Sequence, residues 1–102
     1  MAVQYIKEHY SENLTINDLA EVFNMSPNYF SSIFKKEIHQ SPVNFITGIR
    51  IKEAQEMLVS SNLSVADIAQ KTGYEDGQYF FRVFKKYTGM TPLQYRENNC
   101  QL

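Results

Sequence analysis

The segments Leu63-Ser-Val-Ala-Asp-Ile-Ala-Gln and Tyr79-Phe-Phe-Arg-Val-Phe-Lys-Lys each have an earlier counterpart in the chain. The counterparts are Leu14-Thr-Ile-Asn-Asp-Leu-Ala-Glu and Tyr29-Phe-Ser-Ser-Ile-Phe-Lys-Lys. The copies lie 49 residues apart in the first segment and 50 apart in the second, so the later copy has one extra residue between its segments. A repeat of this length indicates one supersecondary unit that is used twice. Each unit has the pattern of a helix, a tight turn and a second helix that ends in two lysines.

Both copies carry matching signals for the start and the end of helices. A Ser or Thr followed three residues later by Asp predicts the start of the first helix, because these side chains can bond the free N–H groups of its first turn. Asn or Gly then ends this helix, since both tolerate the left-handed backbone of a tight exit. The starts are Thr15 with Asp18 and Ser64 with Asp67, the exits are Asn24 and Gly73, and the second helices begin at Ser26-Pro27 and Asp76.

Three further helices complete the prediction. Apolar residues between Val3 and Tyr10 have helical spacing, Ser41-Pro42 opens a long helix that runs to about Ser60, and Thr91-Pro92 opens a short last helix. Gly48 lies inside the long helix, where glycine costs ~1 kcal/mol, and we expect close packing at this position. No stretch alternates long enough to predict a strand, so we expect an all-α fold with about seven helices.

Composition limits the classes of protein that fit the chain. Its 102 residues suit one compact domain or two very small subdomains, and no apolar run approaches the ~20 residues that cross a bilayer. Lys7 and Glu8 interrupt any signal-peptide pattern, and the single cysteine, Cys100, excludes an internal disulfide. A reducing, cytoplasmic setting is therefore expected. The net charge of −1 does not itself indicate nucleic-acid binding, although bases gather in Lys35-Lys36 and in Arg82, Lys85 and Lys86.

The spacing inside each copy predicts a helix-turn-helix. This motif needs a small residue that lets the second helix pack closely, and a turn residue that accepts positive φ. Ala20 with Asn24 meets both needs in the first copy, and Ala69 with Gly73 meets them in the second. Such spacing is weak evidence alone, but two copies with matching second helices make it strong.

The chain resembles the DNA-binding domain of the AraC/XylS family of bacterial transcription regulators. The resemblance covers roughly Val3 to Arg96. Its residues are Asp67-Ile-Ala, Gly73-Tyr74-x-Asp76, Tyr79-Phe80-x-Arg82-x-Phe84-Lys85-Lys86, Thr88-Gly89-Met90-Thr91-Pro92-x-x-Tyr95-Arg96 and, in the linker, Arg50-Ile51-x-x-Ala54-x-x-Met57-Leu58. The chain also resembles variants of this domain that follow receiver domains in two-component response regulators.

The resemblance implies two helix-turn-helix subdomains joined by a long linker helix, each with a recognition helix in the major groove. The expected parts of this 1–102 DNA-binding domain are a first subdomain at 3–40, a linker helix at 41–61, a second subdomain at 62–97 and a tail at 98–102. A linker helix from Pro42 to Ser60 is ~28 Å long. Adjacent major-groove segments on one DNA face lie ~34 Å apart. The linker therefore suits two recognition helices nearly one turn apart, with modest DNA bending.

The outward faces of the two second helices supply the candidate base contacts. Family resemblance places base-contacting residues at these positions: Asn28, Ser31, Ser32, Gln78, Phe81 and Arg82. Gln78 and Asn28 suit adenine, Arg82 suits guanine, and Phe81 can meet a thymine methyl group. Because serines are short and permissive, we expect the second copy to supply more of the sequence discrimination.

Basic residues elsewhere supply the candidate phosphate contacts, which position a protein on DNA without reading its sequence. They are Lys35, Lys36, Arg50, Lys52, Lys85 and Lys86. His9 and His39 are isolated from other metal-binding side chains, so we expect neither a metal nor another cofactor. No nucleophile–base pair or phosphate-binding loop predicts an enzyme.

Two functional hypotheses follow. The first is sequence-specific binding of double-stranded promoter or operator DNA by the effector domain of a bacterial transcription regulator. The alternative is a helix-turn-helix module that docks on RNA polymerase or another regulator without reading DNA, which Phe81 and the near-neutral charge favour. In the first case we expect a sensing or receiver domain N-terminal to this chain in a longer parent protein, although a complete small regulator is the other reading. RNA polymerase is then a further candidate partner, and no membrane association is expected.

Overall fold

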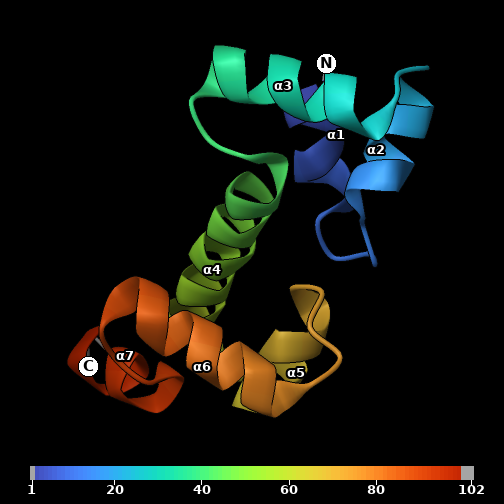
Figure 1. Ribbon diagram of the computed structural model, residues 1–102. Helices are drawn as coiled ribbons and strands as arrows, with labels where there is room; N and C mark the ends of the chain where they lie inside the picture. Colours follow the sequence, from blue (N-terminus) through green and yellow to red (C-terminus); the bar gives the residue numbers. More distant parts are fainter. Residues whose placement is uncertain (1, 100–102) are drawn as a thin grey trace. The chain divides into compact units, whose positions relative to one another are not determined.

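The structure, a computed structural model, describes residues 2–99 as seven helices without a strand in that range (Figure 1). The predicted all-α class is therefore confirmed. The helices are α1 (Ala2–His9), α2 (Ile16–Val22), α3 (Pro27–Ile38), α4 (Pro42–Ser60), α5 (Val65–Lys71), α6 (Gly77–Thr88) and α7 (Pro92–Asn99). Cys100 lies outside the described residues, and α7 includes the first two residues of the predicted tail. None of the described helices is long and apolar enough to cross a membrane.

The chain divides into two compact units, residues 1–49 (unit 1) and 50–102 (unit 2). Each unit holds one copy of the repeat and builds a core of its own. In unit 1, helices α1 to α3 and the start of α4 bury Ile6, Leu19, Ala20, Phe30, Phe34 and Ile46. The phenylalanine rings of this core are in contact, with centroids 5.8 Å apart for Phe30 and Phe34. The apolar face of α3 thus points inward, which turns its polar face to solvent.

The helix-turn-helix of unit 1 forms as its sequence predicts. The Asp18 N–H donates to the Thr15 hydroxyl (3.1 Å) and the Thr15 N–H donates to the Asp18 carboxylate (3.2 Å), which completes the capping box. Asn24 then takes a positive φ of 56°, and the Met25 N–H donates to the Ala20 carbonyl at 2.9 Å. Ser26 caps α3, whose first residue is Pro27.

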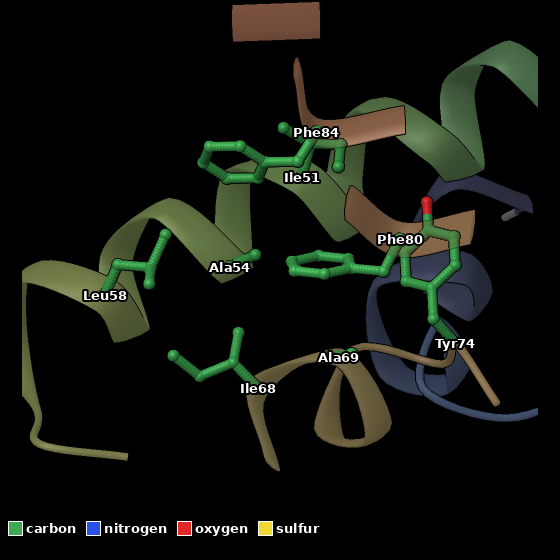
Figure 2. Packing of buried hydrophobic residues seen from close by; sticks show 8 residues of the cluster. All are labelled: Ile51, Ala54, Leu58, Ile68, Ala69, Tyr74, Phe80 and Phe84. Atoms are coloured by element: carbon green, nitrogen blue, oxygen red, sulfur yellow. The ribbon is translucent and has the colours of Figure 1, made fainter. Parts of the chain in front are cut away.

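Unit 2 buries a second core between α4, α5 and α6 (Figure 2). Its buried residues are Ile51, Ala54, Leu58, Ile68, Ala69, Tyr74, Phe80 and Phe84. Figure 2 shows the ring of Phe80 pointing toward Ala54, with the ring of Tyr74 beside it. The Phe84 ring meets Tyr95 of α7 edge-on at 5.6 Å, so α7 closes this core.

The turn of unit 2 repeats the geometry of unit 1 with different residues. Gly73 has a φ of 98°, and the Tyr74 N–H donates to the Ala69 carbonyl at 2.9 Å, as Met25 does to Ala20. The extra residue of the second copy, Glu75, lies between this turn and the N-cap residue Asp76. The Asp76 carboxylate accepts from the Gln78 N–H at 2.9 Å. The one-residue insertion therefore leaves the helix-turn-helix intact.

Two residues have roles that the sequence did not lead us to expect. His39 ends α3 in the left-handed region with a φ of 69°, the position that Gly89 takes after α6 with a φ of 80°. Arg96 of α7 donates to three carbonyls at and beyond the end of α4, those of Leu58 (2.9 Å), Ser61 (3.3 Å) and Leu63 (2.7 Å). Arg96 thereby satisfies carbonyls that a helix end leaves without partners.

The expected close packing at Gly48 is wrong. A Cβ atom added at Gly48 meets no neighbouring heavy atom within 4 Å among the described residues. Gly48 is also absent from the residues with positive φ. Neither space nor backbone conformation in the chain itself therefore requires glycine at this position of α4.

Candidate nucleic-acid interface

Helix α3 presents the candidate base-contacting residues of unit 1. Asn28 and Ser32 are exposed, whereas Phe30 and Phe34 are buried. Ser31 differs from the expectation of an outward residue, because it is half-buried. Ser31 lies about 60° around the helix from the buried Phe34, at the edge of the buried face. The outward face of α3 is therefore narrower than the sequence predicts.

Helix α6 presents a fuller set in unit 2. Gln78, Phe81 and Arg82 are all exposed, and Phe81 keeps 43% of its surface accessible although it occupies the same helical position as Ser31. These three residues and Gly77 line a shallow hollow on the outer face of α6. An aromatic ring, an amide and a guanidinium thus lie together on one helix face, which offers apolar contact and directional hydrogen bonds.

The tyrosine of each second helix is also exposed. Tyr29 of α3 is 58% exposed and Tyr79 of α6 is 51% exposed. In unit 2 the guanidinium carbon of Arg82 lies 5.9 Å from the centroid of the Tyr79 ring. Arg82 therefore has a defined aromatic neighbour, which the sequence pattern alone did not identify.

The predicted phosphate contacts divide into two groups. Lys35 and Lys36 in the last turn of α3, and Lys85 and Lys86 in the last turn of α6, are exposed, as is Lys52 of α4. Arg50 is instead half-buried, with its guanidinium carbon 5.4 Å from the centroid of the Tyr74 ring. The four helix-end lysines are free to meet an anion, whereas Arg50 is already held against an aromatic ring.

Tyr74 is the one titratable group among the described residues whose pKa clearly departs from its usual value. It is 5% exposed, and its hydroxyl makes no hydrogen bond of standard geometry there. The guanidinium of Arg50 lies over the face of its ring. Burial raises the pKa of the Tyr74 phenol above its usual 10.0, and the positive charge of Arg50 opposes this rise. Tyr74 is therefore neutral at pH 7 and belongs to the support of the interface.

The histidines show one departure from expectation. His9 was expected to be isolated, but its Nδ1 lies 2.7 Å from Glu12 Oε2 and its ring stacks on Tyr5 with a centroid distance of 4.2 Å. The turn after α1 brings His9 and Glu12 together, since residues three apart can face each other in helical geometry. Among residues 2–99 no three His, Cys, Asp or Glu side chains come close enough to hold a metal ion.

Two helix-turn-helix units, each with an exposed second helix that ends in two lysines, define a duplicated helix-turn-helix domain. A family model described as a helix-turn-helix domain matches residues 19–98. The chain belongs to this family, in its AraC type, as the resemblance implied.

Curated relatives share most of this chain. The raffinose operon transcriptional regulatory protein RafR of Pediococcus pentosaceus is 39% identical over 98 residues, which are 96% of this chain and 35% of RafR. The melibiose operon regulatory protein of Escherichia coli K12 is 37% identical over 97 residues, 95% of this chain and 32% of that protein. The chain thus spans about a third of the length of these relatives.

Solved structures have the same fold. The C-terminal domain of AraT, a response regulator from Geobacillus stearothermophilus, has a TM-score of 0.97 and 39% identity, and covers 99% of this chain and 84% of that one. The DNA-binding domain of the global transcriptional factor AdpA, solved in complex with a target DNA, has a TM-score of 0.91 and 26% identity, and covers 95% and 87%. The domain type therefore occurs both in a response regulator and in a complex with DNA.

Proposed function

We propose that the chain is the sequence-specific, double-stranded-DNA-binding effector domain of a bacterial transcription regulator. The duplicated helix-turn-helix with an exposed polar face on each second helix carries this proposal. Helices α3 and α6 are the recognition helices, and each enters one of two adjacent major-groove segments. The AdpA domain, which has the same fold and was solved with a target DNA, supports DNA binding by this type of domain.

The base contacts follow from the chemistry of the exposed side chains. Arg82 donates two hydrogen bonds to guanine, Gln78 pairs with adenine, and the ring of Phe81 meets a thymine methyl group. In unit 1, Asn28 contacts adenine, and the hydroxyl groups of Ser31 and Ser32 accept several bases. Because Ser31 is half-buried, α3 offers fewer base contacts than α6, and unit 2 supplies most of the discrimination.

The phosphate contacts come from the two pairs of helix-end lysines, with Lys52 beside them. These side chains are exposed and lie on the second helix of each unit or on α4. Arg50, held against Tyr74, contacts a phosphate with a guanidinium whose position is already restricted. Such contacts set the register of the protein on DNA and make the affinity sensitive to salt.

The parent protein of this domain is a longer cytoplasmic regulator. The chain spans about a third of the length of its curated relatives, which leaves room for a sensing or receiver domain in the parent protein. We place this domain on the N-terminal side because the matching part of AraT is its C-terminal domain. The similarity to the C-terminal domain of AraT favours a receiver domain. RNA polymerase is a further candidate partner of such a regulator.

Selection from random DNA duplexes at several salt concentrations tests the proposal. We expect enrichment of a bipartite, asymmetric site, with an affinity that falls steeply as salt rises because bound counterions are released. A footprint limited to one major-groove segment contradicts binding by both recognition helices. Failure to enrich any site, together with salt-insensitive capture of RNA polymerase, favours the protein-docking alternative.

A further inference from the structure

Four side chains of unit 2 form a row in which arginine and tyrosine meet at each end. The guanidinium carbon of Arg50 lies 5.4 Å from the Tyr74 ring, the rings of Tyr74 and Tyr79 are 6.0 Å apart, and Arg82 lies 5.9 Å from the Tyr79 ring. These distances are within the range of cation–π and aromatic contacts. The row runs from a residue of α4 to the exposed face of α6.

The inner half of this row is fixed by the core. Tyr74 is 5% exposed, and the centroid of its ring lies 5.3 Å from that of Phe80. Figure 2 shows the two side chains next to each other in the core. A buried ring in such surroundings keeps one orientation, because core side chains occupy single rotamers. Tyr74 therefore gives the half-exposed Tyr79 ring a stationary neighbour.

The outer half of the row holds Arg82. Residues three apart on a helix face each other, so Arg82 reaches back over the ring of Tyr79. Among residues 2–99 no carboxylate forms an ion pair with Arg82. The Tyr79 ring is thus the contact that restricts the guanidinium in the unbound protein.

Unit 1 keeps the tyrosine but lacks both of its neighbours. Tyr29 corresponds to Tyr79, whereas Met25 stands where unit 2 has Tyr74, and Ser32 stands where it has Arg82. The aromatic support and the supported arginine are therefore found together in one unit and are both replaced in the other. A role of the tyrosine that depends on arginine can exist only in unit 2.

We propose that Tyr79 is a positioning residue that orients Arg82 for its contact with guanine. The Tyr79 ring holds the guanidinium plane before DNA arrives, so that less side-chain freedom is lost when the two hydrogen bonds form. Tyr79 thereby determines specificity at the base pair that Arg82 reads without touching that base pair. This inference rests on the proposed DNA-binding function.

The test measures the affinities of Tyr79→Leu, Tyr79→Phe, Arg82→Ala and the Tyr79→Leu/Arg82→Ala double variant for the selected site and for single-base variants of it. We expect Tyr79→Leu to weaken binding about two- to fivefold and to reduce discrimination at the base pair that Arg82 reads. Tyr79→Phe keeps the aromatic ring and therefore retains both the affinity and the discrimination at this base pair. In the Arg82→Ala background, Tyr79→Leu has no further effect. Tyr29→Leu, the matched change in unit 1, leaves base discrimination unchanged.

Three results overturn the inference while the DNA-binding function stands. In the first, Tyr79→Phe loses as much affinity as Tyr79→Leu, which assigns the effect to the hydroxyl. In the second, Tyr79→Leu loses the same affinity for every single-base variant of the site. In the third, Tyr79→Leu still loses affinity in the Arg82→Ala background. Unchanged discrimination in Arg82→Ala overturns both the inference and the assignment of Arg82 to a base. Thermal unfolding of each variant monitors folding, and Tyr79→Gln provides a second ring-free variant if Tyr79→Leu does not fold.

Discussion

Arg96 is a single side chain on which the second unit depends. Its guanidinium donates to three carbonyls, those of Leu58, Ser61 and Leu63, at the point where α4 ends and the chain turns toward α5. Arg96→Met keeps the aliphatic stem but leaves these carbonyls without their donor, so we expect a loss of about 2–4 kcal/mol in the free energy of unfolding. Urea denaturation followed by circular dichroism measures this loss.

Two further variants show whether the guanidinium itself is responsible. Arg96→Lys restores a charge but not the planar set of donors, and we expect it to recover only part of the lost stability. Glu97→Met places the same apolar side chain on the next, exposed position of α7 and should change the stability little. A loss below about 0.5 kcal/mol in Arg96→Met, the scale of ordinary surface substitutions, contradicts the anchoring role.

Tyr74 makes the stability of unit 2 sensitive to high pH. Burial raises the pKa of its phenol in the folded state above 10.0, so between the unfolded and folded values the folded protein holds a proton that the unfolded chain has lost. The contribution of the protonated Tyr74 phenol to stability is fully present below its pKa in the unfolded chain. It is lost as the pH rises through its pKa in the folded protein. We expect Tyr74→Phe to lose less stability above pH ~10 than the unsubstituted protein.

Urea denaturation of both proteins across this range measures the effect, and because their other tyrosines are shared, the difference between them isolates Tyr74. At pH 7 Tyr74→Phe removes a buried hydroxyl without a standard hydrogen bond, so stability should be equal or higher. Parallel pH profiles of the two proteins contradict the raised pKa.

At the scale of the helices, we expect replacement of two glycines by alanine to change the stability in opposite directions. Gly48 lies inside α4, with open space around a new Cβ and no positive φ, so Gly48→Ala should stabilise the protein by about 1 kcal/mol through helix propensity. Gly89 ends α6 with a φ of 80°, so Gly89→Ala should destabilise it by about 1–2 kcal/mol although space is also open there. Urea denaturation of both variants provides the comparison. A destabilised Gly48→Ala contradicts the account of α4.

Helix ends were mostly predictable from sequence because capping is local chemistry. Thr15 with Asp18, and Asp76, form the caps that their spacing predicts. His39 was missed as a helix end, because histidine is not the residue expected in the left-handed region. The repeat contained the signal, since Gly89 stands at the matching position of the second copy.

At the scale of the whole chain, the repeat predicted the all-α class and the two helix-turn-helix units, because hydrophobic spacing and turn residues recur together. The candidate interface was less predictable. The sequence indicates which residues of α6 face outward, but the contacts of Arg50 with Tyr74 and of Arg82 with Tyr79 depend on side-chain directions that spacing alone does not determine. The half-buried state of Ser31 was missed for the same reason.

The salt dependence of binding tests whether both units engage DNA. The plot of log affinity against log salt has a negative slope, and each phosphate contact contributes about 0.9 to the magnitude of this slope. We therefore expect the double variants Lys35→Gln/Lys36→Gln and Lys85→Gln/Lys86→Gln each to reduce the magnitude of the slope by up to about 1.8. The base preferences should stay unchanged, because phosphate contacts carry no sequence information. Lys7→Gln, an exposed lysine of α1 outside the proposed interface, is the matched control and should leave the slope unchanged. If only one pair reduces the magnitude of the slope, only one unit meets the phosphate backbone, and the chain then binds DNA through a single helix-turn-helix.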